Sequence, residues 1–506
     1  MGFMDNLQLG LSVAFEFSNL LYCFVGVSIG TLVGVLPGIG AVGTMAILLP
    51  VTFGIPPTAA IIMLAGIYYG AMYGGSTTSI LVNLPGEAAS VVTTLDGYQM
   101  ARQGRAGPAL GISAFGSFIA ATLSIIALQF VANPLASIAL RFGPPEYFSV
   151  MVLAFVFLTY LAQKSLVKAL MMAAVGGLLG TIGLDTFSGL PRFTFGIPDL
   201  LDGIGLVPVG MGLFGISEIF VNAEKILQRE IYKTEIKHLL PSLRDWMDSK
   251  WAILRGTVIG FFVGALPGPG ASVASFASYA VEKRVSKRPE KFGTGVIEGV
   301  AGPESANNSA TVGSMVPLLT MGIPGSLATA MLLGALMIQG ITPGPLLVKE
   351  HPDLLWGVIF SMYIGNVMLL IINLPLIGLW VRLLRIPYSL LFPLIVLVCM
   401  IGGYAVRNTT VDLWLMLIFG VVGYLFRKFE YEPAPLILAF VLSDLFDETL
   451  RQSLILSKGS FSIFFVRPIS CGCLIFAALI LGSSIISSLR GPSAQKKKGE
   501  KVKTQD

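Results

Sequence analysis

Two runs of hydroxyl and amide side chains lie within strongly apolar stretches of this chain. The runs comprise Ser76, Thr77, Thr78, Asn307, Asn308, Ser309 and Thr311. Polar side chains are costly in lipid, so in a membrane protein they face the bundle interior or a water-filled cavity. Their hydroxyl and amide groups suit a carboxylate, or a Na⁺ shared with unwound backbone carbonyls. The alternative is interhelical hydrogen bonding, which is common for Ser and Thr.

Carboxylates and special backbone positions flank these runs. Glu304, like Glu298, stands at the entry to the second run and is a candidate site for a coupling proton or cation. The alternative for both is helix capping or contact with cytoplasmic water. Asn83 precedes a Leu-Pro-Gly triplet and is a further substrate candidate, and Gly322 is a further coupling candidate. The two histidines fall in polar loops, so the only metal we expect is Na⁺, and the only cofactor is a coupling Na⁺ or H⁺.

A nearly identical hexapeptide precedes each polar run, at 36–41 (Leu-Pro-Gly-Ile-Gly-Ala) and at 266–271 (Leu-Pro-Gly-Pro-Gly-Ala). Proline removes a helix donor and glycine relaxes the backbone, so each copy predicts a break in a membrane helix. The helix that restarts exposes free N–H groups at its positive dipole end, which attracts anions. Substrate-binding candidates at the two breaks are Gly38, Gly40, Ala41, Gly268, Pro269, Gly270 and Ser272. A simple kink or a packing glycine is the alternative for either break alone.

Composition places these residues in a membrane. The chain has 506 residues, of which 54% are hydrophobic and 12% charged, about half the charged fraction of a soluble domain. The net charge of +5 is concentrated in polar stretches beside apolar segments, where Lys and Arg mark the cytoplasmic side. We therefore expect a polytopic membrane protein that does not bind nucleic acid.

Charge also predicts the orientation of the two breaks. Lys and Arg residues in 223–255 and in 283–291 put both ends of segment 251–281 inside, which makes it a re-entrant hairpin. The first hairpin ends near residue 53 without charge, which suits the outside. Residues 1–19 either lie on the membrane or cross it.

The repeat extends well beyond the hexapeptide. Residues 74–86 align with 313–325 at a separation of 239 positions, and the charge pattern orients the two copies oppositely. Inverted repeats with broken helices are typical of secondary transporters. The sequence thus predicts an all-α polytopic membrane protein with two inverted-topology repeats, re-entrant helical hairpins and about 12 membrane segments. The expected parts are an N-terminal repeat 1–222 (hairpin 20–53, broken segment 57–95, scaffold helices 108–222), a cytoplasmic linker 223–250, a C-terminal repeat 251–489 (hairpin 251–281, broken segment 306–342, scaffold helices 355–489) and a basic cytoplasmic tail 490–506.

Long motifs in both halves resemble one transporter family. These are 74–87 (Gly-Gly-Ser-Thr-Thr-Ser-Ile-Leu-Val-Asn-Leu-Pro-Gly-Glu), 96–110, 302–308 (Gly-Pro-Glu-Ser-Ala-Asn-Asn) and 319–325. They resemble the large permease subunit, TctA type, of the tripartite tricarboxylate transporters, across nearly the whole chain. The chain departs mildly from the family at 302–308, where Gly302 and Ser305 stand in place of alanines.

The resemblance implies a multi-pass permease of the bacterial inner membrane that imports a citrate-like carboxylate by Na⁺ or H⁺ symport. Its implied partners are a small membrane subunit of the TctB type and a periplasmic solute-binding protein of the TctC type. A dimer of heterodimers is compatible with it. The resemblance leaves open which carboxylate is carried, and whether the motion is of the elevator or the rocking kind.

Two other functional classes remain to be separated from a carrier. A channel would share the polar interior, and substrate counterflow distinguishes the two. An intramembrane enzyme would use the buried Ser, Glu and Asn residues, but the sequence has no Gly-x-Ser-x-Gly elbow and no His-Glu-x-x-His pair. We therefore expect no enzyme activity.

Overall fold

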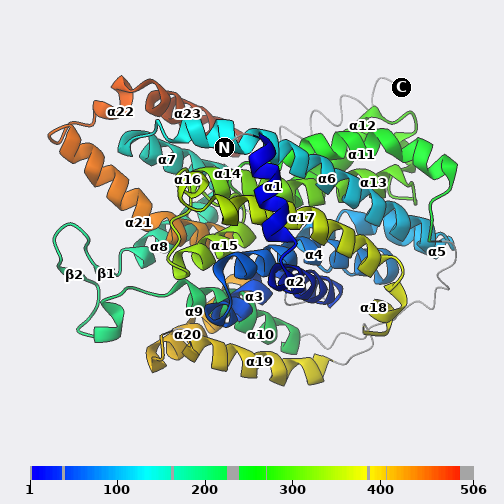
Figure 1. Ribbon diagram of the computed structural model, residues 1–506, viewed down its shortest axis with the longest axis horizontal. Helices are drawn as coiled ribbons and strands as arrows, with labels where there is room; N and C mark the ends of the chain where they lie inside the picture. The colour runs from blue at the N-terminus through cyan, green and yellow to red at the C-terminus, as the bar shows by residue number, and fades with distance from the viewer. Residues whose placement is uncertain are drawn as a thin grey trace.

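The computed structural model describes residues 3–36, 40–160, 165–224, 239–268, 270–383, 388–405 and 407–489. In these residues the fold is almost entirely helical (Figure 1). The first half contains α1 (Phe3–Ala14), α2 (Phe17–Val35), α3 (Gly40–Leu48), α4 (Pro57–Val82), α5 (Gln99–Arg102), α6 (Ala106–Ala139), α7 (Pro144–Tyr160), α8 (Leu166–Gly180), β1 (Gly183–Leu184), β2 (Pro191–Arg192), α9 (Leu206–Gly210) and α10 (Ser217–Glu224).

The second half repeats this helical character. It contains α11 (Leu243–Gly264), α12 (Gly270–Val285), α13 (Glu298–Gly313), α14 (Met315–Met321), α15 (Leu327–Ile338), α16 (Leu347–Glu350), α17 (Pro352–Asn373), α18 (Ile377–Leu383), α19 (Tyr388–Ala405), α20 (Thr410–Lys428), α21 (Pro433–Leu456), α22 (Ile463–Val466) and α23 (Pro468–Leu489). Short 3-10 turns cover Leu49–Gly54, Ala88–Ser90, Pro198–Leu200 and Pro289–Lys291, and π-helical turns cover Thr94–Tyr98 and Met211–Ile216. Strands β1 and β2 pair antiparallel, with Gly183 opposite Arg192.

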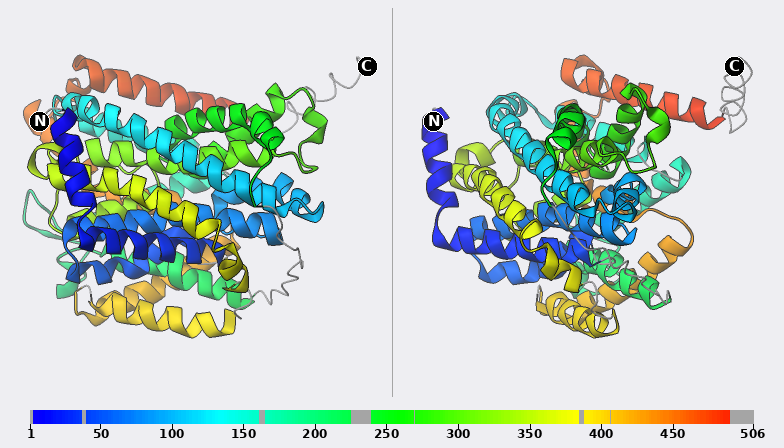
Figure 2. Two further views of the ribbon diagram at one scale, coloured as in Figure 1. Left: turned by 45° about the vertical axis from the view of Figure 1, so that its right-hand side comes forward. Right: turned by 90° about the vertical axis from the view of Figure 1, so that its right-hand side faces the viewer.

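Five helices of the described chain are long and apolar enough to cross a membrane: α2, α4, α6, α17 and α20. Further apolar helical stretches of 10–17 residues lie within α7, α8, α15, α19 and α23, among others, and the count of about 12 segments stays a prediction. Helix α1 has 12 residues, which at 1.5 Å each is too short to span the hydrocarbon core, and it crosses the long helices instead of running along them (Figure 2).

The two halves are interleaved. Helix α21 of the second half packs on α7 and α8, while the turn Met211–Ile216 of the first half packs on α19 and α20. These two groups form opposite edges of the molecule, and α4 lies between them, buried along nearly its whole length (Figures 1 and 2). The polar run of α4 is therefore held at the centre of the bundle.

The same glycine contacts hold the first helices of each half together. On α2, glycines 26, 30 and 34 face the carbonyls of α4 residues 63, 67 and 71. On α11, glycines 256, 260 and 264 face the carbonyls of α13 residues 302, 306 and 310. The glycines of the two sets are 230 positions apart, like the two hexapeptides. The carbonyl residues that they face are 239 positions apart, like the two polar segments. Small residues at such positions let two helix backbones approach closely.

We expect Gly30→Ala and Gly260→Ala to destabilise the protein by about 1–3 kcal/mol each, because overpacking forces the helices apart. A methyl group at Gly30 would meet the Ile67 carbonyl oxygen at 2.5 Å, and one at Gly260 would meet that of Ala306 at 2.3 Å. The control is Gly177→Ala on α8, where nothing lies within 4 Å of the added methyl. Thermal unfolding in detergent checks this, and equal stability of all three variants would contradict the matched packing.

Several helices begin before the segment boundaries that we expected. The linker was expected to reach residue 250, but α11 begins at Leu243 because Ser242 and Asp245 cap it reciprocally: the Asp245 N–H donates to Ser242 Oγ at 3.2 Å and the Ser242 N–H to Asp245 Oδ2 at 3.0 Å. Helix α13 likewise begins at Glu298, before the expected start at 306, and α2 begins at Phe17, before 20. The remainder of the linker at 225–238 and the tail at 490–506 lie outside the described residues.

Arginines lie at both ends of the bundle. Helices α5 and α18, which carry Arg102 and Arg382, lie at one end of the long axis in Figure 1. Strand β2, with Arg192, and α22, next to Arg467, lie at the opposite end.

Candidate functional site

The helix breaks after the two polar runs have matching backbone geometry. Helix α4 ends at Asn83 with φ 56°, and α14 ends at Gly322 with φ 74°, both left-handed. These residues are 239 positions apart, so they are equivalent in the repeat. Asparagine and glycine are the residues that adopt this conformation at least cost. Asn83 and Gly322 thus share a backbone role at the helix ends.

The glycine of each following Leu-Pro-Gly or Ile-Pro-Gly triplet packs under its own hairpin. A methyl group on Gly86 would meet the Gly34 carbonyl oxygen at 1.9 Å, and one on Gly325 would meet that of Gly264 at 2.9 Å. In the second half the Gly268 N–H also donates to the Gly325 carbonyl at 3.1 Å. Each hairpin break is therefore held against the break in the following segment.

At the two hairpin tips the predicted residues start the restarting helices. Gly40 has φ +68° and Gly268 has φ +149°, conformations that favour glycine. Gly270 begins α12, Ser272 is half-buried in its first turn, and the Ala41 N–H donates to Glu87 Oε1 at 2.6 Å. The tip candidates Gly38 and Pro269 lie outside the described residues.

A fully buried carboxylate lies where α4 meets α13. Glu304 accepts hydrogen bonds from the hydroxyls of Ser76 and Thr93, one to each carboxylate oxygen. Within the part of the chain that the structure describes, no lysine or arginine forms an ion pair with it. An ionised carboxylate without a cation is unfavourable in a low-dielectric interior, so this position favours a bound proton or cation.

The asparagine pair lies next to this carboxylate on α13. Asn308 Nδ2 donates to Ser117 Oγ of α6 at 2.7 Å and to the Glu304 carbonyl at 3.2 Å, which leaves its Oδ1 without a partner. Asn307 is fully buried, and among the described residues neither of its side-chain polar atoms has a hydrogen-bond partner. Unsatisfied buried amides are rare and call for an explanation such as a ligand.

Three other hydroxyls of the runs, those of Thr78, Thr311 and Ser309, are bonded within the protein. Thr78 donates to the Gly75 carbonyl at 3.0 Å and Thr311 to the Asn307 carbonyl at 3.0 Å, while Thr77 is buried on α4. Ser309 donates to the Thr257 carbonyl at 2.6 Å and lies 2.7 Å from Ser124 Oγ. These two contacts are interhelical hydrogen bonds, which were the alternative to ligand binding for Ser309.

The structure adds residues that the sequence did not single out. Tyr68 Oη lies 3.2 Å from Ser326 Oγ, and the Thr311 side chain is also near the Tyr68 hydroxyl. Thr93 reaches Glu304 from a short segment after α4, which no periodicity marked. A sequence signal for Ser326 exists, because this residue directly follows the second Pro-Gly dipeptide of the repeat.

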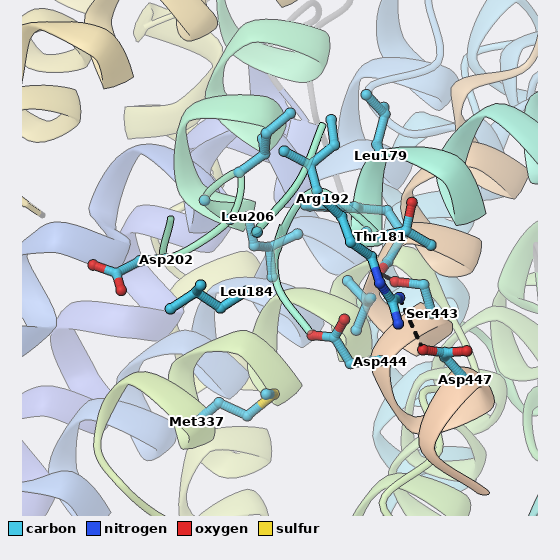
Figure 3. A pocket seen from close by; sticks show the side chains of 18 of the residues that line it. Leu179, Thr181, Leu184, Arg192, Asp202, Leu206, Met337, Ser443, Asp444 and Asp447 are labelled. Atoms are coloured by element: carbon cyan, nitrogen blue, oxygen red, sulfur yellow. Dashed lines mark hydrogen bonds and ion pairs between the residues drawn. The ribbon is translucent and has the colours of Figure 1, made fainter. Parts of the chain in front are cut away.

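An open cavity of about 540 Å³ lies elsewhere, between the loop after α8, the end of α15 and α21 (Figure 3). Its lining carboxylates outnumber its arginines: Asp185, Asp202, Asp444, Asp447 and Glu448 face Arg192 and Arg407. Two salt bridges lie beside it, with Asp185 2.7 Å from Arg192 and Asp447 2.9 Å from Arg451. The hydrogen bond from Ser188, helped by the two guanidinium groups, outweighs burial and holds the pKa of Asp185 well below its usual range. This acidic lining is unsuited to a carboxylate.

The described residues contain no group of three or more His, Cys, Asp or Glu side chains arranged to hold a metal ion. Their hydroxyls, amides and one buried carboxylate instead gather between broken helices. This architecture is that of a multi-pass membrane protein, and broken helices around a polar interior are a transporter feature.

The comparisons with known proteins also indicate a membrane transporter. Residues 20–438 match the tripartite tricarboxylate transporter TctA family, so the chain belongs to that family, as its motifs suggested. An Agrobacterium vitis protein, "Uncharacterized 52.8 kDa protein in TAR-I ttuC' 3'region", is 49% identical over 490 residues, covering 97% of this chain and 98% of that protein. A second from the same organism, "Uncharacterized protein in TAR-II ttuC' 3'region", is 48% identical over 236 residues, covering 47% of this chain and 98% of that protein. No solved structure matches the chain.

The family is a transporter family, and its members work with the other components of a tripartite system.

Proposed function

We propose that this chain is the permease subunit of a secondary transporter that imports a citrate-like tricarboxylate or a related organic carboxylate. The observation that carries the proposal is the buried Glu304, bonded by two hydroxyls and without a cationic partner in the described chain, next to the unsatisfied Asn307. A transporter needs interior groups that bind cargo and coupling ion in turn, and these groups provide them.

The two halves are inverted-topology repeats in this proposal, each with a hairpin, a broken segment and scaffold helices. The shared shifts of 230 and 239 positions between equivalent packing contacts support the repeat. The Lys and Arg residues that flank segment 251–281 on both sides, against an uncharged end of the first hairpin, support the opposite orientation.

Substrate carboxylates bind at the hairpin tips and the polar runs. Helix N-termini offer free N–H groups there, and the asparagine side chains offer amide donors. The proposed substrate residues are Gly38, Gly40, Ala41, Ser76, Thr77, Thr78, Asn83, Gly268, Pro269, Gly270, Ser272, Asn307 and Asn308.

The coupling ion is H⁺ or Na⁺, and Glu304 is its proposed site. A proton neutralises the buried carboxylate directly, whereas Na⁺ recruits neighbouring hydroxyl and carbonyl oxygens such as those of Thr311 and Gly322. Ser309 contributes less to the proposed ion site, since its hydroxyl is already bonded to two neighbouring helices.

The proposed setting is the bacterial inner membrane. The partners are a small membrane subunit of the TctB type and a periplasmic binding protein of the TctC type, with a dimer of heterodimers as the complete assembly. The family supports partners of this kind, because its members act in tripartite systems.

The chain, reconstituted in proteoliposomes together with its two proposed partners, tests the proposal. The probes are radiolabelled citrate, malate, tartrate and succinate, with uptake driven by an imposed Na⁺ gradient, by a pH gradient, or by unlabelled substrate inside. A carrier shows counterflow when no ion gradient is present. If citrate-like probes equilibrate without counterflow, the protein is a channel and the proposal is wrong.

Bulky side chains at the hairpin tips provide a second test. Gly40→Leu and Gly270→Leu should each lower counterflow by about tenfold or more, because the side chain blocks approach to the helix N-terminus. The control is Gly177→Leu on α8, which has open space around it. Membrane insertion is checked by the elution profile of the purified protein. Normal transport by both correctly inserted tip variants would remove the tips from the site.

A further inference from the structure

The two broken segments differ at one pair of equivalent residues, Glu87 and Ser326. Each follows a Pro-Gly dipeptide, and the backbone N–H of each donates to the hydroxyl three residues later. The Glu87 N–H lies 3.4 Å from Ser90 Oγ, and the Ser326 N–H lies 2.7 Å from Thr329 Oγ1. The backbones are therefore in register while the side chains are chemically different.

The two side chains take different partners. Ser326 caps its own helix, since its Oγ accepts the Thr329 N–H at 3.2 Å. Glu87 instead turns to the first hairpin, where its Oε1 accepts the Ala41 N–H at 2.6 Å. A methyl group on Gly40 would lie 3.4 Å from that oxygen, so glycine leaves room for it. A carboxylate of the chain itself thus lies at the N-terminus of α3.

The surroundings of Glu87 favour an exchangeable contact. The side chain is half-buried, and its carboxylate accepts the Ala41 backbone N–H. No lysine or arginine of the described residues forms an ion pair with it, so the positive end of α3 supplies the balancing charge. The titratable groups facing it are the Tyr68 hydroxyl and Glu218, and Glu218 is paired with Arg427.

We propose that the N-terminus of α3 is a carboxylate subsite that Glu87 fills in the absence of substrate and yields to a carboxylate of the substrate. Glu87 is then a specificity residue, because it competes with cargo for one of the two hairpin tips. That the entering carboxylate belongs to the substrate rests on the proposed function, whereas the preference of the tip for a carboxylate does not.

The first experiment measures the tip alone, with sodium formate as the probe and sodium chloride as the ionic-strength control. Thermal unfolding of full-length protein in nanodiscs is compared for wild type, Glu87→Ala and Glu87→Gln. Formate should raise the Tm of Glu87→Ala clearly more than that of wild type, because it takes the vacated place on α3, with Glu87→Gln in between. Equal formate responses in Glu87→Ala and wild type would overturn the proposal.

The second experiment uses Glu87→Gln, which keeps an acceptor for the Ala41 N–H and so preserves the fold. Removing the charge weakens the internal competitor, so the counterflow KM for the transported probe should fall about fivefold. An unchanged or higher KM would mean that Glu87 is only a structural cap. If wild type shows no counterflow with any carboxylate, the proposed function fails, while the formate result still decides whether the tip binds carboxylates.

Discussion

Glu304→Gln should exchange substrate across the membrane but no longer accumulate it. The amide keeps an acceptor for Ser76 and replaces the group that takes up a proton or Na⁺. We expect gradient-driven uptake to fall by about a hundredfold, equivalent to about 2.7 kcal/mol of lost cation binding. Counterflow without a gradient should stay close to the wild-type rate. Both are measured in the same proteoliposomes.

The matched control is Glu298→Gln, six positions earlier on the same helix and half-buried. Both glutamates were candidates from sequence, but Glu298 lies in the first turn of α13 and Glu304 lies fully buried between helices. Glu298→Gln should retain driven uptake. If Glu304→Gln accumulates substrate as well as wild type does, the coupling assignment is wrong.

Asn307→Leu should change stability and transport in opposite directions. A buried amide without partners costs about 1–3 kcal/mol, so a similar-sized apolar side chain should leave the protein as stable as wild type or more so. Transport should fall by about a hundredfold, because the amide is then absent from the site. Thermal unfolding in detergent and counterflow measure the two effects.

Asn373→Leu on α17 provides the comparison. Asn373 is also buried with an unsatisfied Oδ1, although its Nδ2 donates to the Leu369 carbonyl at 2.9 Å. It is not among the proposed substrate residues, so its replacement should spare transport. A loss of transport in both variants would point to general disturbance of the bundle, and a loss in neither would exclude Asn307 from the site.

The sequence predicted those features that depend on local pattern. The paired hexapeptides marked the two helix breaks, and the repeat shift of 239 positions correctly matched Asn83 with Gly322. The helical membrane character followed from composition, and the family followed from long motifs. Each of these signals lies within a short stretch of chain or in its copy.

Contacts between distant segments were not predictable in the same way. The bond between the Ala41 N–H and Glu87 joins a hairpin tip to a loop 46 positions away, and no local pattern encodes that approach. Thr93 reaches Glu304 across 211 positions. The start of α11 at Leu243 was missed for a different reason, because its charged first turns resemble a linker. Ser242 and Asp245 nevertheless form a capping box that the sequence shows.

A structure determined with bound substrate tests the central claim most directly, because the claim is that the hairpin tips and polar runs form one site. The account predicts a carboxylate of the ligand within hydrogen-bond distance of a restarting helix, at Ala41 or Gly270, with the Asn307 amide also engaged. Ligand bound instead in the acidic cavity between Asp185 and Asp444, with the tips and Asn307 unengaged, would contradict it.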